Sequence, residues 1–499
     1  MKKRLILAIM LFALPVLLLA NCGDTGDGGG GDDGANIGPG NGGGQTEDEQ
    51  PAVERVMPNL PDRHFDGHNF RVIVRPCWAP HWETICIASE ELTGEPINDS
   101  VFNRNTILAA RHGFELEHLV AEGGVSGFVT RSINAGSDDF DAILTTIQES
   151  STFASRGFLV PFSELKYVDL AKPWWDQSAN ADMSIGHINF YAMGDIALMA
   201  NDATWVFFFN KLMAQELDLG NLYEIVNEGN WTLDTLSEFG RAATRDLNGD
   251  GVLDHTDQWG FTGAVESSSV FVTSAGERTV SKDADDLPVI TMDNPRATAV
   301  FDRVFEIMTD ETFVILAERH WDVFSYDPWV GVNVNMFREG RALFMGHPLT
   351  TIKQLRDMEY DFGILPMPKF NAEQEQYFNV LQYNNATVYS VPVTAPDVER
   401  TGFILEAMAA ESRYLVTPAY YEVTLQRKHT RDEESGEMLD LIFSTRILDV
   451  GFVFNWQNLQ GFYSDMVTRR QNTFASAFER IEQRLMADIE RTLEAFGLD

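Results

Sequence analysis

The sequence predicts an α/β fold built on a parallel sheet, in a folded body of two or three domains. Two observations carry this prediction. Stretches with strand character alternate with a helical stretch between about residues 69 and 146, and this order favours a parallel sheet covered by helices. The chain from about Met57 to Asp499 is also too long for one simple core.

The first elements follow from local patterns. Asn98 or Asp99, both good capping residues, predict the start of a helix, and Gly113 predicts its end. Apolar and β-branched residues predict the flanking strands at residues 69–74, 114–120 and 140–146.

Further strands and helices are predicted in the rest of the chain. Thr232 predicts the capped start of a helix. Strands are expected at residues 188–191, 196–199, 205–209, 342–345, 360–365 and 387–391. Helical spacing of apolar residues predicts a long amphipathic helix at the C-terminus, with a buried face formed by Phe474, Phe478, Ile481, Leu485, Ile489 and Phe496.

The N-terminus has the pattern of an export signal. Three basic residues precede an apolar run over residues 5–20, which is shorter than the ~20 residues of a membrane-spanning helix. Cys22 follows this run, and the pattern resembles a bacterial lipoprotein lipobox, although Asn21 is bulkier than the usual residue there. We therefore predict a signal peptide over residues 1–21 and a lipid on Cys22. The alternative is an ordinary secreted protein with a chance cysteine.

Residues 22–59 are predicted to form a tether. The stretch after Cys22 is rich in glycine and aspartate and nearly free of apolar residues, so it cannot bury enough surface to fold. A lipid, a tether and a folded body in this order predict a protein held at the outer face of the bacterial cell membrane.

Charge and cysteine content exclude some functions. The formal net charge of −38 argues against nucleic acid as a partner, because phosphate binding needs a basic surface. Cys77 and Cys86 are the only cysteines besides Cys22. They form either a disulfide, which is favoured outside the cytosol, or two free thiols.

Residues 246–257 match the twelve-residue calcium loop of an EF-hand. Oxygen ligands recur at the required positions, and Gly251 stands at the sharp turn. The predicted ligands of a structural Ca²⁺ ion are Asp246, Asn248, Asp250, Val252 through its carbonyl, Asp254 and Asp257. The alternative is a surface turn without a metal.

Four motifs in this order resemble the extracellular solute-binding proteins (family 1) of bacterial ABC importers. They are Lys172-Pro-Trp-Trp-Asp176, Phe207-Phe-Phe-Asn-Lys211, Asp361-Phe-Gly-Ile-Leu-Pro-Met-Pro368 and Thr417-Pro-Ala-Tyr-Tyr421. The resemblance extends from about residue 66 to 495. It implies a two-lobed, periplasmic-binding-protein-like α/β fold of type II, with crossing strands between the lobes and helices at the C-terminus.

The resemblance also implies domain boundaries and a function. Lobe one would comprise residues 60–197 and 389–430, and lobe two residues 198–388 and 431–499 with the calcium loop. The expected protein is a monomeric receptor, not an enzyme, that binds a sugar or oligosaccharide between its lobes. Closure of the lobes would then deliver the solute to the permease subunits of an ABC transporter.

A sugar-binding cleft needs aromatic rings and hydrogen-bonding side chains. The candidates at predicted strand ends and crossovers are Trp78, Trp82, Glu149, Trp205, Trp329, His347 and Tyr383. For each of them, packing in the core is the alternative.

Three other functions compete with this interpretation. An exported polysaccharide hydrolase or lyase is the enzyme alternative; the sequence has no HExxH or GxSxG motif, but a pair of catalytic carboxylates is not excluded. A peptide-binding receptor is another alternative. A calcium-dependent adhesion module is the third, suggested by the loop at residues 246–257.

Overall fold

The computed structural model describes residues 55–77, 79–82, 87–325, 327–425 and 433–498. The chain divides into two units between Val56 and Met57, and the helices and strands below belong to the second unit. Cys22, Trp78 and Cys86 lie outside the described residues. Within the described ranges, no helix combines the length and the apolar character needed to cross a membrane.

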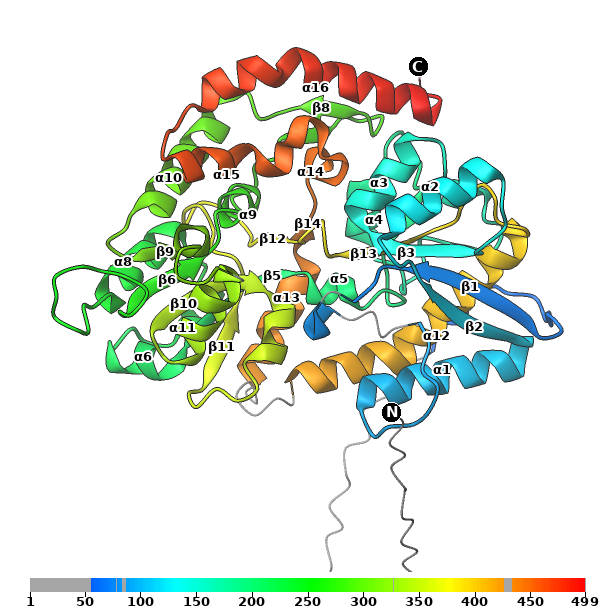
Figure 1. The fold of residues 1–499 in the computed structure, drawn as a ribbon, viewed down its shortest axis with the longest axis horizontal. Coiled ribbons are helices and arrows are strands. Elements are labelled where there is room, and N and C mark those ends of the chain that lie inside the picture. Colours follow the sequence, from blue (N-terminus) through cyan, green and yellow to red (C-terminus); the bar gives the residue numbers. More distant parts are fainter. Residues whose placement is uncertain (1–54, 78, 83–86, 326, 426–432, 499) are drawn as a thin grey trace, which may run out of the picture. The chain divides into compact units, whose positions relative to one another are not determined.

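The first sheet has five strands in the order β2-β1-β3-β13-β4 (Figure 1). β1 runs parallel to β2 and β3, with Val72 opposite His118 and Ala142, whereas β13 runs antiparallel to β3 and β4. The predicted parallel arrangement and the strands that carry it are confirmed. The bounds are β1 (His68–Val74), β2 (Phe114–Val120), β3 (Ala142–Thr146), β4 (Tyr191–Ala192) and β13 (Thr387–Ser390).

The second sheet has five strands in the order β11-β5-β10-β6-β9. β6 runs parallel to β10 and β9, and β5 runs antiparallel to β10 and β11. The strands predicted at residues 205–209, 342–345 and 360–365 are confirmed. The bounds are β5 (Trp205–Asn210), β6 (Trp259–Gly263), β9 (Val314–Leu316), β10 (Ala342–Pro348) and β11 (Phe362–Leu365).

Two small sheets complete the strands. Parallel β12 (Asn379–Val380) and β14 (Arg446–Ile447) pair segments that are far apart in the sequence, and β7 (Val280–Lys282) pairs antiparallel with β8 (Pro288–Ile290).

The helices before residue 340 are α1 (Pro96–His112), α2 (Val125–Ala135), α3 (Ile147–Ser155), α4 (Gln177–Met183), α5 (Met199–Asp202), α6 (Lys211–Glu216), α7 (Leu222–Asn227), α8 (Leu233–Ala243), α9 (Ser267–Ser274), α10 (Pro295–Thr309) and α11 (Met336–Arg338).

The predicted start of α8 is confirmed, whereas α1 starts earlier than predicted. Thr232 caps α8 as predicted, because its hydroxyl accepts the Thr235 N–H at 3.3 Å. α1, however, begins before Asn98, with a proline in its first turn, where the missing N–H costs nothing. Asp99 instead accepts the Thr93 N–H at 2.8 Å and so orders the preceding loop.

One predicted strand is wrong and another is much shorter than expected. Residues 196–199 form a turn that leads into α5. Ile196 and Leu198 are nevertheless buried, and a short buried apolar run does not by itself distinguish a strand from a helix. Of the strand predicted at 188–191, only Tyr191 belongs to β4.

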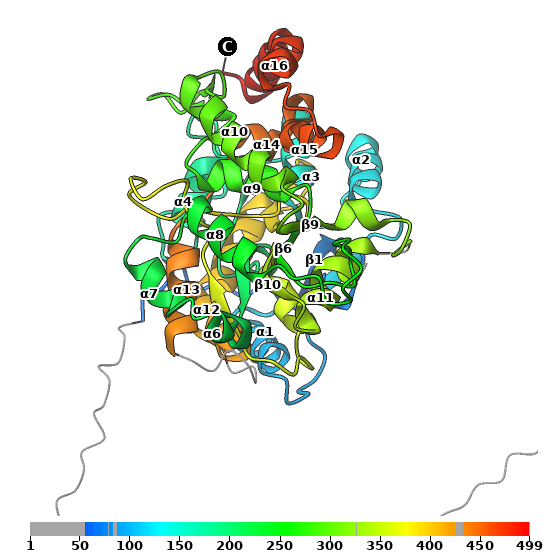
Figure 2. The ribbon, with the colours of Figure 1, turned by 90° about the vertical axis from the view of Figure 1, so that its left-hand side faces the viewer.

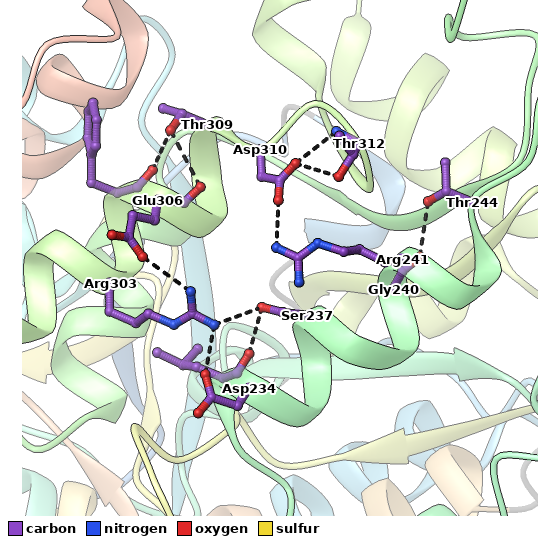
Figure 3. A network of polar contacts seen from close by, with 12 residues as sticks. Asp234, Ser237, Gly240, Arg241, Thr244, Arg303, Glu306, Thr309, Asp310 and Thr312 are labelled. Atoms are coloured by element: carbon purple, nitrogen blue, oxygen red, sulfur yellow. Dashed lines mark hydrogen bonds and ion pairs between the residues drawn. The ribbon is translucent and has the colours of Figure 1, made fainter.

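Ion pairs connect α8 and α10 on one surface of the molecule (Figure 3). Arg303 of α10 contacts Asp234 of α8 at 2.7 Å, and Arg241 of α8 contacts Asp310 at 2.7 Å. The Asp234 side chain is largely exposed, so we expect the first pair to contribute at most about 1 kcal/mol.

The C-terminal helices pack mainly on other helices and on β11 of the second sheet. They are α12 (Val398–Leu425), α13 (Glu433–Ser444), α14 (Val450–Phe454), α15 (Leu459–Arg469) and α16 (Phe474–Phe496). α12 packs on α1, and α13 packs on β11. α14 and α16 contact α3, while α15 packs on α9 and α10 (Figures 1 and 2).

The predicted long amphipathic helix is confirmed as α16, with Phe474, Phe478, Leu485, Ile489 and Phe496 buried. The exact lobe boundaries stay a prediction.

Glu406 on α12 makes stability depend on pH. Its carboxylate is buried and accepts the Trp175 indole N–H at 2.9 Å, and burial raises its pKa to about 7 from 4.5. The folded chain therefore keeps a proton that the unfolded chain has released, and stability falls as pH rises from about 4.5 to 7. We expect Glu406→Gln to stabilise the protein by about 1–3 kcal/mol at pH 8 and much less at pH 4.5. Urea unfolding at both pH values measures this, and equal effects would contradict it.

Candidate functional site

The candidate site lies where parallel strands of both large sheets end. Arg75 follows β1, Glu149 lies in the first turn after β3, Glu266 follows β6, and Glu318 follows β9. Ligands bind outside the carboxyl ends of the strands in open α/β sheets. All four side chains are half-buried, so they remain accessible to a solute.

A chain of hydrogen bonds connects the two groups of strand ends. Arg75 Nη2 donates to Asn385 Oδ1 at 2.9 Å, and Asn385 Nδ2 donates to Gln382 Oε1 at 2.8 Å. Gln382 Nε2 then donates to Glu266 Oε2 at 3.3 Å. Because Gln382 and Asn385 lie in the segment between β12 and β13, this segment joins the two halves of the site.

Two carboxyl groups form one side of the site. Glu318 Oε2 accepts the Val265 N–H at 3.0 Å, which places it next to Glu266. Burial, and then repulsion from Glu318, raise the pKa of Glu266 to about 7. Burial also raises the pKa of Glu318, although its hydrogen bonds oppose the shift.

Two exposed tryptophans border these carboxyl groups. Trp329 Nε1 donates to Glu318 Oε1 at 3.0 Å, and the Trp329 and Trp321 rings meet edge to face with centroids 5.2 Å apart. Their exposed fractions, 37% for Trp329 and 45% for Trp321, are unusual for such large apolar side chains. Trp329 also begins a π-helical segment, and such segments are frequent at functional sites.

A further set of contacts surrounds His81 and His347. Lys353 Nζ donates to the His81 carbonyl at 3.2 Å and forms an ion pair with Asp202. His347 lies at the end of β10 against Trp205, with ring centroids 6.1 Å apart. Burial, followed by the nearby His81, lowers the pKa of His347 to about 3, so its imidazole is neutral at physiological pH.

This geometry suits a small polar molecule with apolar faces. The hydrogen-bond chain supplies donors and acceptors, and the exposed indoles supply flat apolar surfaces.

Comparisons with known proteins agree with the topology. No family model matches the chain, and no curated protein matches its sequence. Solved structures do match. A cyclo/maltodextrin-binding protein complexed with maltotetraose has a TM-score of 0.56 and 13% identity, over 85% of this chain and 98% of that chain. The fold is the two-lobed, periplasmic-binding-protein-like fold of these structures.

Two other structures of this fold extend the comparison. The GacH receptor of Streptomyces glaucescens has a TM-score of 0.53 and 12% identity, over 86% of this chain and 97% of that chain. An ABC substrate-binding protein from Listeria monocytogenes in complex with cycloalternan has a TM-score of 0.52 and 10% identity, over 87% of this chain and 100% of that chain. The predicted two-lobed fold is therefore confirmed.

The predicted ligand residues fall into two groups in this receptor fold. Glu149, Trp329 and His347 are at least partly accessible. Trp82, Trp205 and Tyr383 are buried, with exposed fractions of 4%, 2% and 6%. The Tyr383 hydroxyl accepts the Asp449 N–H at 2.9 Å, which gives it a packing role. Contact with a solute stays a prediction for all of these residues and for Trp78.

Sequence reasoning missed most of the polar residues at the site. They share one signal, which is a position within a few residues of a strand end or in the segment between β12 and β13. The missed residues are Arg75, Glu266, Glu318, Trp321, Gln382 and Asn385.

The predicted calcium loop connects α8 to β6, and its carboxylates accept hydrogen bonds from backbone N–H groups of the same loop. Asp246 accepts the N–H groups of Gly249 and Gly251 at 2.6 and 2.8 Å. Both oxygens of the fully buried Asp257 accept backbone N–H groups, from Leu247 and Asp254, at 2.9 Å. No group of three or more Asp, Glu, His or Cys side chains in the described ranges is placed to hold a metal. Ca²⁺ binding therefore stays a prediction.

The cysteine predictions are not tested. Cys77 is exposed and has a free thiol, whose sulfur lies 3.2 Å from the Ala79 carbonyl oxygen. Pairing with Cys86 and lipidation of Cys22 concern residues outside the described part of the chain.

Proposed function

We propose that this chain is the extracytoplasmic solute-binding receptor of an ABC importer, and that it binds a sugar or oligosaccharide between its lobes. The observation that carries the proposal is the continuous polar chain from Arg75 to Glu266, beside the exposed rings of Trp321 and Trp329. Hydroxyl groups of a sugar would bond to the chain, and its C–H faces would pack on the indoles.

The named ligands of similar structures support a sugar as the solute. Maltotetraose is bound by the cyclo/maltodextrin-binding protein, and cycloalternan by the protein from Listeria monocytogenes. In our proposal, solute contacts on both lobes favour a closed state, and the permease subunits recognise that state. The receptor acts as a monomer and is held at the outer membrane face by a lipid on Cys22.

A binding screen tests this function. We expect at least one mono- or oligosaccharide in a panel that includes maltotetraose and cycloalternan to raise the melting temperature saturably. Chromatography of the same samples should show no loss of the sugar. A panel without any binder would contradict the proposal.

A polysaccharide hydrolase is the second candidate, and one observation favours it. Glu266 and Glu318 are neighbouring carboxyl groups, and a pKa of about 7 suits Glu266 to donate a proton. Continued release of reducing ends from a polysaccharide, abolished by Glu266→Gln, would establish this alternative and exclude the receptor.

We also propose that residues 246–257 bind a structural Ca²⁺ ion. At about 1 mM Ca²⁺, an extracellular-type site with a Kd of roughly 10⁻⁴–10⁻³ M stabilises a protein by about 0.4–1.4 kcal/mol. A chelator should therefore lower the melting temperature by a few degrees, and Asp246→Ala should remove this response. An unchanged melting temperature in the wild-type protein would contradict the assignment.

A further inference from the structure

The carboxyl groups of Glu266 and Glu318 form no ion pair within the described part of the chain, although the neighbouring Arg319 attracts Glu318 electrostatically. The hydrogen bonds they accept come from neutral donors, namely the Gln382 amide, the Val265 N–H and the Trp329 indole. No ion pair joins either of them to a lysine, arginine or histidine among the described residues. Two half-buried acidic groups therefore stand side by side, and only Glu318 is attracted by a cation, Arg319, so the pair is costly when both are ionised.

The nearest guanidinium groups are engaged elsewhere. Arg319 follows Glu318 directly, but its Nη1 donates to Glu311 at 2.8 Å. Arg75 donates to Asn385, and the carboxylate that acts on it electrostatically is Glu149. The carboxyl groups after β6 and β9 thus form no ion pair with these guanidinium groups, and Arg319 offsets the charge of Glu318 only in part, because the pKa of Glu318 is still raised.

The adjacent tryptophans favour the same kind of occupant. The faces of indole rings attract cations, and Trp is the strongest aromatic side chain in this respect. No described lysine or arginine lies over the ring of Trp321 or Trp329, although such contacts occur at other aromatic residues of this chain. The indole faces and the two carboxyl groups adjoin each other through the bond between Trp329 and Glu318.

We infer that Glu266, Glu318, Trp321 and Trp329 form a subsite for a protonated amine, and that the solute is an amino sugar. This inference rests on the proposed receptor function. The ammonium group would donate charge-assisted hydrogen bonds to the two carboxylates, while the sugar ring would pack on an indole. A neutral sugar would not provide that gain.

Matched pairs of sugars test the subsite. Isothermal titration at pH 7 would compare glucosamine, galactosamine and chitobiose with their N-acetylated forms, which have similar rings but no charge. We expect at least one amine to bind about tenfold or more tightly than its N-acetylated partner, the size of one charge-assisted hydrogen bond. Glu266→Gln and Glu318→Gln should each reduce that preference by about tenfold.

Controls separate this inference from the proposed function. Glu216→Gln, at an exposed position on α6, should keep the preference, and the melting temperature of each variant checks its fold. If N-acetylated or other neutral sugars such as maltotetraose bind as tightly as any amine, the inference is wrong while the receptor function stands. If no sugar binds, both are wrong. An amine preference that survives both glutamine variants also overturns the subsite.

Discussion

Replacing Asp449 by alanine is expected to destabilise the protein by about 3–5 kcal/mol. Its side chain is fully buried and accepts the Thr279 hydroxyl at 2.8 Å and backbone N–H groups of Thr279, Val280 and Gly451. It thereby joins β7 to the start of α14. Alanine would leave three N–H groups buried without an acceptor. Burial raises the pKa of Asp449, while these donors oppose the shift.

Urea unfolding of the variant measures this loss. Asp465→Ala is the matched control, because Asp465 is exposed on α15 and has only a 3.6 Å ion pair with Arg469. We expect the control to change stability by less than about 0.5 kcal/mol. A similar small change for Asp449→Ala would show that α14 is held by other contacts.

Removal of both exposed indoles is expected to weaken sugar binding by about 100-fold. Trp321 and Trp329 are the apolar surfaces of the candidate site, and truncation of a central tryptophan typically costs about 2 kcal/mol or more. Since both side chains are substantially exposed, the double alanine variant should unfold at nearly the wild-type temperature. Titration with the best sugar from the screen gives the affinity.

Phenylalanine at position 329 provides the control for this prediction. Trp329→Phe keeps an aromatic face but loses the indole N–H that bonds to Glu318. We expect it to retain most of the affinity if ring packing dominates. Wild-type affinity in the double alanine variant would mean that the sugar binds elsewhere.

The sheets were predictable because their strands carry strong local patterns. Residues 205–209, five consecutive apolar residues, become part of the fully buried strand β5, between β11 and β10 of the second sheet. Residues 196–199 have a similar composition, but they fold as a turn and the start of a short helix, α5. Tertiary context decides such short buried runs, and local sequence does not report it.

The site was predictable only in part, because large aromatic residues are ambiguous. Trp205 and Trp329 are the same residue type, yet one fills the core and the other is exposed beside Glu318. Glu266 and Gln382 look like ordinary surface residues in the sequence. The pairing of β6 with β9 places Glu266 near Glu318. The return of the chain before β13 brings Gln382 within hydrogen-bond distance of Glu266.

Small-angle X-ray scattering tests the central claim, which is that two lobes close around a solute. The radius of gyration should fall when the sugar identified by titration is added at saturating concentration, and it should stay constant with a sugar that does not bind. An unchanged radius of gyration at full saturation would contradict the account.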